Sequence, residues 1–351
     1  MSEMREIILD TTARIFTDLG APQEIILAGD DGWKAPLWSA LEEAGLTRAW
    51  LPEEDGGAGL SVTDSFAILR VAGRFAVAVP LAETLLAARL LSASGLAVPL
   101  GAIALVAPEG GAPPRLTNAT LDGEAHGVAF AREAEHLALF GNGEEGPMVA
   151  LVAAADCTIR AADGIAGEAS DAVAFDGLPV LASAPAGMTE EAMRRLGAVV
   201  RATQMAGALE GLLEISVGYA QERVAFGRPI GKFQAVQHLL ARLAEETAAA
   251  VAAASSAALA LETLPLDGEA VFIEAAAAKI RAGEAAREGA MIAHQVHGAI
   301  GYTAEHPLHR YVQRLWGWRD DFGQEAQWAL RLGRRAAAHG SRGFWPAITA
   351  A

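Results

Sequence analysis

Residues 219–246 read YAQERVAFGRPIGKFQAVQHLLARLAEE, and they join two long amphipathic segments through a Gly–x–Pro turn. Apolar residues recur on one helical face on each side of the turn: Met205, Leu209, Leu212, Leu213, Val217 and Ala220 before it, and Val236, Leu240, Leu243 and Thr247 after it. The pattern predicts two packed helices, with Arg223 at the end of the first. From Thr189 to this turn Gly and Pro are sparse, so we expect long helices in the C-terminal half of the chain.

Composition limits the classes of function. The chain has 351 residues and a formal net charge of −16, which suits two or three domains and argues against nucleic acid or an anionic membrane surface as a partner. Cys157 is the single cysteine, which fits a reducing compartment. The N-terminal sequence MSEMREIILDTTARIF lacks a basic region followed by an apolar core, so we expect a cytoplasmic protein.

Three zones differ in texture. Residues 1–97 show helical periodicity, and Ser61 with Asp64 is placed to begin a helix after the Gly-rich stretch WLPEEDGGAGLS. Residues 98–188 contain short apolar runs parted by Gly, Pro and Asn (AIALVA, GVAFA, HLALF, MVALVAA, AVAFDGLPV), which predict strands. Residues 189–351 return to long helices. We therefore expect an α+β multidomain fold with an N-terminal helical domain, a middle β-domain and a C-terminal four-helix bundle.

Three segments carry a resemblance to a known family. Residues 219–246 resemble the acyl-CoA dehydrogenase signature Arg–x–x–Phe–Gly–x–Pro–Ile followed by Phe–Gln. QVHGAIGYTAEHPLHR (residues 295–310) resembles the later Gln–x–x–Gly–Gly–x–Gly–Tyr element, and AWLPEEDGGAGLSVTD (residues 49–64) resembles the N-terminal Pro–Glu–Glu element. The resemblance implies FAD held between the subunits of a homodimer or homotetramer, oxidation of an acyl-CoA between its α and β carbons, and an electron-transfer flavoprotein as acceptor.

The resemblance also implies which residues bind FAD. These are Arg223, Phe226, Phe233 and Gln234 in the first segment and Gln295, Val296, Gly298 and Ala299 in the second. A guanidinium holds a pyrophosphate bidentately, and a glycine lets the backbone approach phosphate oxygens. Simpler alternatives remain for each type: Arg223 paired with Glu222, core packing for the phenylalanines, and solvated glutamines. The family usually has glycine where this chain has Ala299.

The histidines near the second segment raise the question of a metal site. His294, His297, His306 and His309 lie close together in the sequence, but no acidic residue accompanies a His–x–x–x–His helical spacing. We therefore expect polar or phosphate contacts and no metal.

The expected catalytic base is missing. In many members a glutamate that precedes a glycine removes the α-proton, and here Phe322 precedes Gly323 in RLWGWRDDFGQEAQ. Other members carry that glutamate on the first long C-terminal helix, where residues 195–198 read RLGA. Asp320 and Asp321 are the nearest carboxylates, and we expect them to be solvated and paired with Arg319 or Arg314 rather than catalytic.

Two flavin-binding elements of the middle domain are also missing. ALVAPEGGAPPRLTNA (residues 104–119) stands where the family has Thr–Glu–Pro–x–x–Gly–Ser–Asp, and GVAFAREAEHLALF stands where it has Trp–Ile–Thr or Trp–Ile–Ser. The pattern resembles the non-catalytic subunit of bacterial heteromeric acyl-CoA dehydrogenases of fatty acid or steroid catabolism. The implied assembly is then a heterotetramer with a catalytic subunit. A self-sufficient dehydrogenase using Asp321, a scaffold that lost flavin, and a flavin-dependent oxygenase remain as alternatives.

Overall fold

A computed structural model describes residues 3–106, 112–144 and 146–349 of the chain. Helices fill its N-terminal part, and Ser61 begins one of them by accepting a hydrogen bond from the backbone N–H of Asp64 at 3.1 Å, as the sequence predicts. The helices are α1 (Glu3–Leu19), α2 (Pro22–Ala28), α3 (Lys34–Glu43), α4 (Val62–Phe75) and α5 (Leu81–Ala93).

A mixed β-sheet follows. Its strands, as the described residues show them, are β1 (Ile103–Val106), β2 (Arg115–Thr117), β3 (Thr120–Ala129), β4 (His136–Gly143), β5 (Gly146–Ala153), β6 (Thr158–Arg160), β7 (Ser170–Pro179) and β8 (Ala182–Pro185). The order is β6-β7-β3-β2-β4-β5-β8, and β1 pairs with β4 in parallel. All five predicted strand runs contain a strand. Residues 104–119 stand where the family has its first flavin-binding element, and residues 107–111 of this segment lie outside the described residues.

The alternation of side chains along the strands separates two apolar cores. Ile103 and Leu105 of β1 face the helices and belong to the large core, while Ala104 and Val106 face a smaller core inside the sheet domain. The same strand therefore serves both layers, and α5 covers the helix-facing side.

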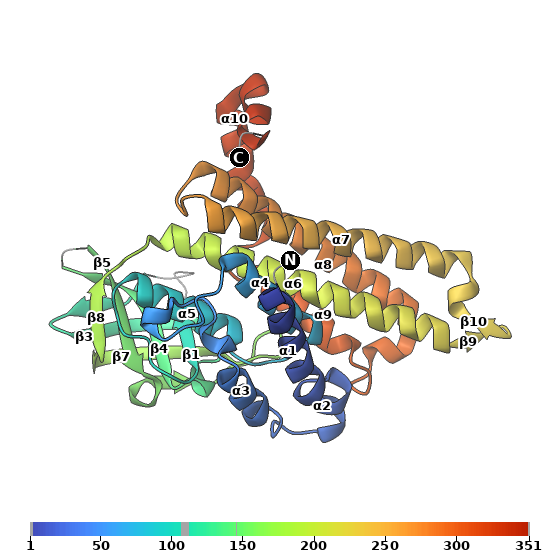
Figure 1. Cartoon of the computed structure of the whole chain (residues 1–351), viewed down its shortest axis with the longest axis horizontal. Helices are drawn as coiled ribbons and strands as arrows, with labels where there is room; N and C mark the ends of the chain where they lie inside the picture. Colours follow the sequence, from blue (N-terminus) through green and yellow to red (C-terminus); the bar gives the residue numbers. More distant parts are fainter. Residues whose placement is uncertain (1–2, 107–111, 145, 350–351) are drawn as a thin grey trace.

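Long helices make up the C-terminal part. They are α6 (Glu190–Glu222), α7 (Gln234–Thr263), α8 (Glu269–His297), α9 (Leu308–Asp320) and α10 (Glu325–Thr349), and the hairpin of β9 (Val224–Ala225) and β10 (Arg228–Pro229) joins α6 to α7. Figure 1 shows α6, α7 and α8 side by side above the N-terminal helices, with the hairpin at one end of the bundle and the sheet at the other. Helix α10 projects from the body and kinks at Gly340.

The predicted architecture of helices, sheet and helical bundle is confirmed. The structure changes from helices to strands between Ala93 and Ile103, and back to helices between Pro185 and Glu190, close to the predicted borders at residues 97 and 188. Independent folding of the three parts stays a prediction. Among the described residues, none of the helices is long and apolar enough to cross a membrane.

Candidate functional site

The loop of residues 321–324, which holds Phe322, is fixed by hydrogen bonds on three sides. Buried Lys279 of α8 donates from Nζ to the carbonyls of Trp318 and Arg319, at 2.9 and 2.7 Å, and so satisfies the end of α9. Arg201 of α6 binds the carboxylate of Asp321, and Trp328 Nε1 donates to the carbonyl of Phe322 at 2.9 Å. The loop therefore has one well-defined conformation.

Phe322 stands at the position where the sequence predicts the missing base, and it packs against Gly197, which lies within the stretch 195–198 predicted for the alternative base position. The Phe322 side chain is 5% exposed, and its backbone φ of +53° lies in the left-handed region that a bulky residue rarely adopts. A methyl group at Gly197 would lie 2.3 Å from two ring carbons of Phe322. The ring thus fills the space above α6, and neither position supplies a carboxylate.

A buried charge network lies beside this pair. The Arg201 guanidinium donates to Asp321 Oδ2 at 2.8 Å, Gln204 Oε1 at 2.7 Å and Glu83 Oε1 at 2.6 Å. Burial lowers the pKa of Arg201, but the nearby carboxylates Glu83 and Asp321 outweigh it and the pKa lies above its ordinary value.

This network corrects the predicted partners of the aspartates. Asp321 is only partly exposed and pairs with Arg201, whereas Arg319 pairs with Glu325 and Arg314 with Glu168. The prediction failed because Arg201 lies more than a hundred residues away in sequence, and only the packing of α6 against the end of α9 brings it to Asp321.

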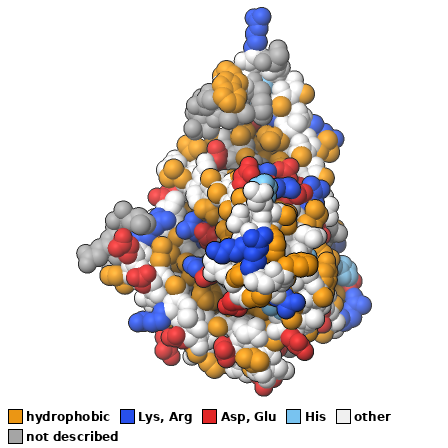
Figure 2. Space-filling model, turned by 90° about the vertical axis from the view of Figure 1, so that its right-hand side faces the viewer, with side chains coloured by type: hydrophobic (Ala, Val, Ile, Leu, Met, Phe, Trp, Pro, Cys, Tyr) orange, Lys and Arg blue, Asp and Glu red, His pale blue; other side chains and the backbone are white. Residues whose placement is uncertain are grey.

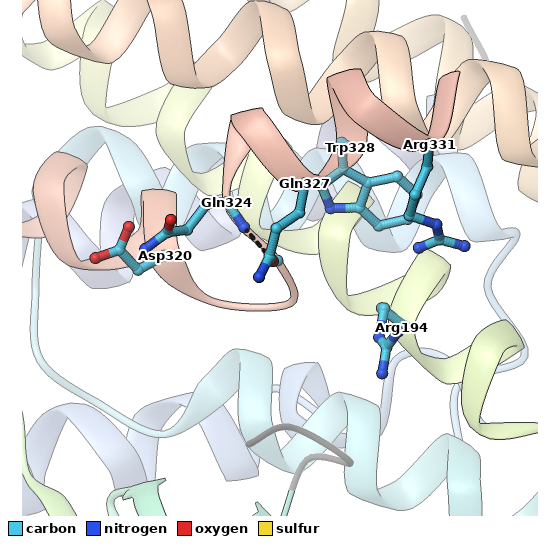
Figure 3. Close-up of a pocket in the computed structure, with 7 residues that line it drawn as sticks. Arg194, Asp320, Gln324, Gln327, Trp328 and Arg331 are labelled. Atoms are coloured by element: carbon cyan, nitrogen blue, oxygen red, sulfur yellow. Dashed lines mark hydrogen bonds between the residues drawn. The ribbon is translucent and has the colours of Figure 1, made fainter. Parts of the chain in front are cut away.

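Two cavities flank the loop. One, of about 270 Å³, lies between α5, the sheet and α6 and is lined by Glu83, Arg201, Asp321 and Phe322 among others. That volume falls just below the usual range of roughly 300–1,000 Å³ for small-molecule pockets. The other, of about 440 Å³, lies between α6 and the start of α10, and Figure 3 shows its lining: Arg194, Asp320, Gln324, Gln327, Trp328 and Arg331. Gln327 accepts the backbone N–H of Gln324 there at 3.1 Å.

Glu168, just before β7, is a second buried acid near the loop. Its carboxylate accepts a hydrogen bond from Trp318 Nε1 at 3.3 Å and lies 3.5 Å from Arg314 Nε. Burial raises the pKa of Glu168 to about 7, and the charge of Arg314 offsets only part of that rise. Glu168 is therefore a group that titrates near neutral pH inside the protein.

The predicted FAD-binding residues of the first segment lie at the opposite end of the bundle. Arg223 caps α6 and is exposed, and no ion pair with Glu222 forms, so that alternative is not seen. Phe226 at the hairpin tip is 96% exposed and has a φ of +52°. Phe233 packs edge-on against Phe226, with ring centroids 6.2 Å apart, and lies under the guanidinium of Arg228. Gln234 begins α7 and is exposed.

The second segment reaches the same end of the bundle through the C-terminus of α8. Gln295, Gly298 and Ala299 are exposed there, and Gly298 has a φ of +65°, which explains a glycine at that position. Val296 is buried, so its side chain packs in the core and only its backbone is left for a ligand. The assignment of FAD binding to all eight residues stays a prediction.

Aromatic and imidazole rings connect the two segments. Tyr219, one turn before Arg223, stacks on His297 with ring centroids 4.6 Å apart, and His297 contacts His306 at 4.7 Å. Burial lowers the pKa of His306 to about 4, so its ring is neutral near pH 7. Among the described residues there is no group of three or more His, Cys, Asp or Glu side chains arranged to hold a metal ion.

The buried charges Arg201, Glu83 and Glu168 were not among the residues predicted to be functional. A signal was present for Arg201, because it interrupts the apolar run LGAVVRATQMAGAL, and a charge within such a run is buried and paired. Glu83 likewise interrupts an apolar run, AVAVPLAETLLAA, whereas Glu168 gave no comparable signal.

Comparisons with known proteins agree with this architecture. A family model described as "Acyl-CoA dehydrogenase, C-terminal domain" matches residues 190–317. The acyl-CoA dehydrogenase IpdE2 of Mycobacterium tuberculosis is 30% identical over 321 residues, which are 90% of this chain and 92% of that protein. The acyl-CoA dehydrogenase FadE34 of the same organism is 34% identical over 86% of this chain, and this chain spans only 42% of its length.

Solved structures share the fold. The ChsE4–ChsE5 complex of Mycobacterium tuberculosis contains a chain with a TM-score of 0.83 and 23% identity, covering 96% of this chain and 98% of that one. A steroid ACAD variant named Tcur3481–Tcur3483 has a TM-score of 0.83 and 26% identity over the same shares. Fold and sequence together define an acyl-CoA dehydrogenase architecture. The chain belongs to the acyl-CoA dehydrogenase family.

Proposed function

We propose that this chain is an FAD-binding subunit of an acyl-CoA dehydrogenase that supplies no base of its own and acts with a catalytically complete partner chain. The observation that carries the proposal is the contact between Phe322 and Gly197. Neither predicted base position carries a carboxylate, and the phenyl ring of Phe322 lies against Gly197. A phenyl ring takes no proton, so removal of the α-proton falls to another chain.

The exposed end of the bundle fits one half of a shared FAD site. Arg223, Arg228 and Lys232 are exposed cations in a chain whose net charge is −16, and Figure 2 shows basic side chains near the middle of this face with acidic side chains around them. Phe226 is strained and almost fully exposed, which suits an aromatic ring that packs against a ligand or a neighbouring subunit. An anionic dinucleotide matches this combination of cations, aromatic ring and exposed glycine backbone.

The roles of the chain's own residues follow from that fit. Arg223 would hold the pyrophosphate, Phe226 and Phe233 would border the adenine, and Gly298 would bring backbone close to phosphate oxygens. FAD, when bound, accepts the hydride from the β-carbon of the CoA thioester. These residues face outward, away from Phe322, so they serve a reaction centre that a neighbouring subunit completes. An electron-transfer flavoprotein would then receive the electrons.

Two comparisons support a partner chain. FadE34 is more than twice as long as the segment it shares with this chain, and ChsE4–ChsE5 is a complex of two differently named subunits. Both are consistent with a chain of this fold that acts together with a second chain of the same fold. The similarity to a steroid ACAD makes steroid-derived CoA thioesters the first substrates to assay.

Steady-state oxidation of a panel of acyl-CoA thioesters tests the proposal. The chain alone should show no turnover, and the chain combined with a partner acyl-CoA dehydrogenase chain that carries a catalytic glutamate should turn over at least one thioester. Turnover by the purified chain alone, with a rate proportional to its concentration, would contradict the proposal. A colourless preparation that takes up no FAD would favour a scaffold that lost flavin.

A self-sufficient dehydrogenase is the second candidate, because Asp321 and Glu83 both line the cavity beside Phe322. Against it, both carboxylates accept hydrogen bonds from the Arg201 guanidinium, so each is already engaged by a buried cation of the same chain. Asp321→Asn keeps the shape and removes the base. Loss of any activity in this variant would support the second candidate, and unchanged activity would exclude Asp321 as the base.

A further inference from the structure

A separate polar cleft of about 620 Å³ lies where the segment between α2 and α3, the sheet domain and α9 meet. Among the described residues it shares no lining side chain with the cavity beside Phe322. Its walls carry Trp33, Lys34, Arg132, Glu168, Arg310 and Arg314. None of the residues proposed to bind FAD lines it, so what it binds is independent of the proposed function.

Most charges in this cleft neutralise one another. The pairs are Lys34 with Asp31 and Glu133, Arg132 with Asp163 and Asp171, and Arg314 with Glu168. Asp30 accepts the backbone N–H of Gly32 at 2.9 Å and so closes a turn at the rim.

Arg310 is the one cation of this cleft that makes no ion pair within the part of the chain that the structure describes. It is half-buried, makes no ion pair there, and its buried Nε has no hydrogen-bond acceptor. It lies one turn before Arg314 on α9, and two like charges at that spacing repel each other. Burial, and then the charge of Arg314, lower the pKa of Arg310 to about 10. An unpaired arginine held in such surroundings calls for an anion.

Two more buried donors at the same cleft make no hydrogen bond among the described residues. They are the indole Nε1 of Trp33 and the Nε of Arg314, which is only 2% exposed and has the Glu168 carboxylate 3.5 Å away as its ion-pair partner. Trp33 comes from the N-terminal helical part and Arg314 from α9, so the deficit of acceptors arises on two walls. Buried donors are almost always satisfied in folded proteins, by protein, water or ligand.

We propose that this cleft binds a small carboxylate-bearing molecule, whose oxygens accept hydrogen bonds from the Arg310 guanidinium. The planar fork of arginine matches the two oxygens of a carboxylate. Asp30 and Asp31 at the rim repel a dianion more strongly than a singly charged group, which favours a carboxylate over a phosphate.

Titration calorimetry of the full chain with acetate, propionate and inorganic phosphate tests this site. Arg310→Gln should weaken carboxylate binding about tenfold or more, as expected for the loss of hydrogen bonds to a charged group. The matched control Arg334→Gln removes the same charge from an exposed position on α10 and should change the dissociation constant less than about twofold.

A second readout covers the case in which Arg310→Gln does not fold. Trp33→Phe removes the indole N–H with little change of shape, and the missing peak assigns Trp33 in a ¹H–¹⁵N spectrum of the indole region. Carboxylate addition should move that peak in the wild-type chain. No heat and no peak movement with either carboxylate, tighter binding of phosphate, or equal weakening by the two arginine substitutions would each overturn the proposal.

Discussion

The contact between Phe322 and Gly197 predicts that Gly197→Ala and Phe322→Ala are coupled in their effects on the free energy of unfolding. An alanine methyl at position 197 would lie 2.3 Å from ring carbons of Phe322, and overpacking of this kind costs about 1–3 kcal/mol. Alanine is also a better helix former than glycine by about 1 kcal/mol. Gly197→Ala alone should therefore destabilise the chain by about 0–2 kcal/mol.

Without the ring of Phe322, Gly197→Ala should stabilise the chain instead of destabilising it. Phe322→Ala should itself cost about 3–5 kcal/mol, because the side chain is only 5% exposed. In that background the methyl at position 197 meets no ring, so the better helix propensity remains and Gly197→Ala should stabilise by about 1 kcal/mol. The expected coupling free energy is the difference between the two backgrounds, about 1–3 kcal/mol.

Urea unfolding of the four chains, followed by tryptophan fluorescence at a fixed protein concentration, measures this coupling. Gly218→Ala is the matched control, because Gly218 lies on the same helix and nothing stands within 4 Å of an added methyl. It should stabilise by up to about 1 kcal/mol with either residue at position 322. An effect of Gly197→Ala that is the same in both backgrounds would refute the contact and the reasoning built on it.

Three further substitutions test the buried charges and the outward face. Arg201→Gln leaves Glu83 buried without its cation, so urea unfolding should show a loss of about 3–5 kcal/mol, and a loss below about 1 kcal/mol would contradict the network. The pKa of Glu168 is about 7 in the folded chain, above the ordinary 4.5, so the folded chain holds the proton more tightly than the unfolded chain. The contribution of Glu168 to the free energy of unfolding therefore falls as pH rises from 4.5 to about 7. Glu168→Gln keeps the shape of the protonated acid. The free energy of unfolding of the wild type, relative to this variant, should fall by about 2–3 kcal/mol between roughly pH 5 and 8. A difference that stays constant with pH would show that Glu168 titrates normally. Arg223→Gln should lower the FAD-to-protein absorbance ratio of the assembled protein without changing its stability in urea. Val224 is also exposed, and Val224→Ala should leave the ratio unchanged. Equal ratios in the two variants would remove Arg223 from the FAD site.

Local patterns predicted the elements of the fold. Apolar periodicity of 3.6 residues placed α6 and α7, alternating runs placed the strands, and Ser61 marked the start of α4. These elements depend on short sequence windows, which a single sequence contains in full. That the two predicted FAD-binding segments meet at one end of the bundle, where Tyr219 stacks on His297, is a finding of the structure.

Contacts between distant segments could not be predicted in the same way. The pairing of Arg201 with Asp321 joins residues far apart in sequence, and the expected local partners Arg319 and Arg314 bind other acids. Val296 matched a family position but faces the core. The contact of Phe322 with Gly197 needed two helices to be placed against each other, although the sequence had identified both positions as lacking a base.

The visible spectrum of the chain purified alone, with FAD bound and under anaerobic conditions, shows whether the chain contains a working base. Oxidised flavin has a visible absorption band, which is lost when the flavin accepts a hydride. If the chain supplies no base, the band persists on addition of every acyl-CoA in the panel and disappears only when the partner chain is present. Rapid loss of the band in the chain alone would show that a working base exists within it and would contradict the proposed function.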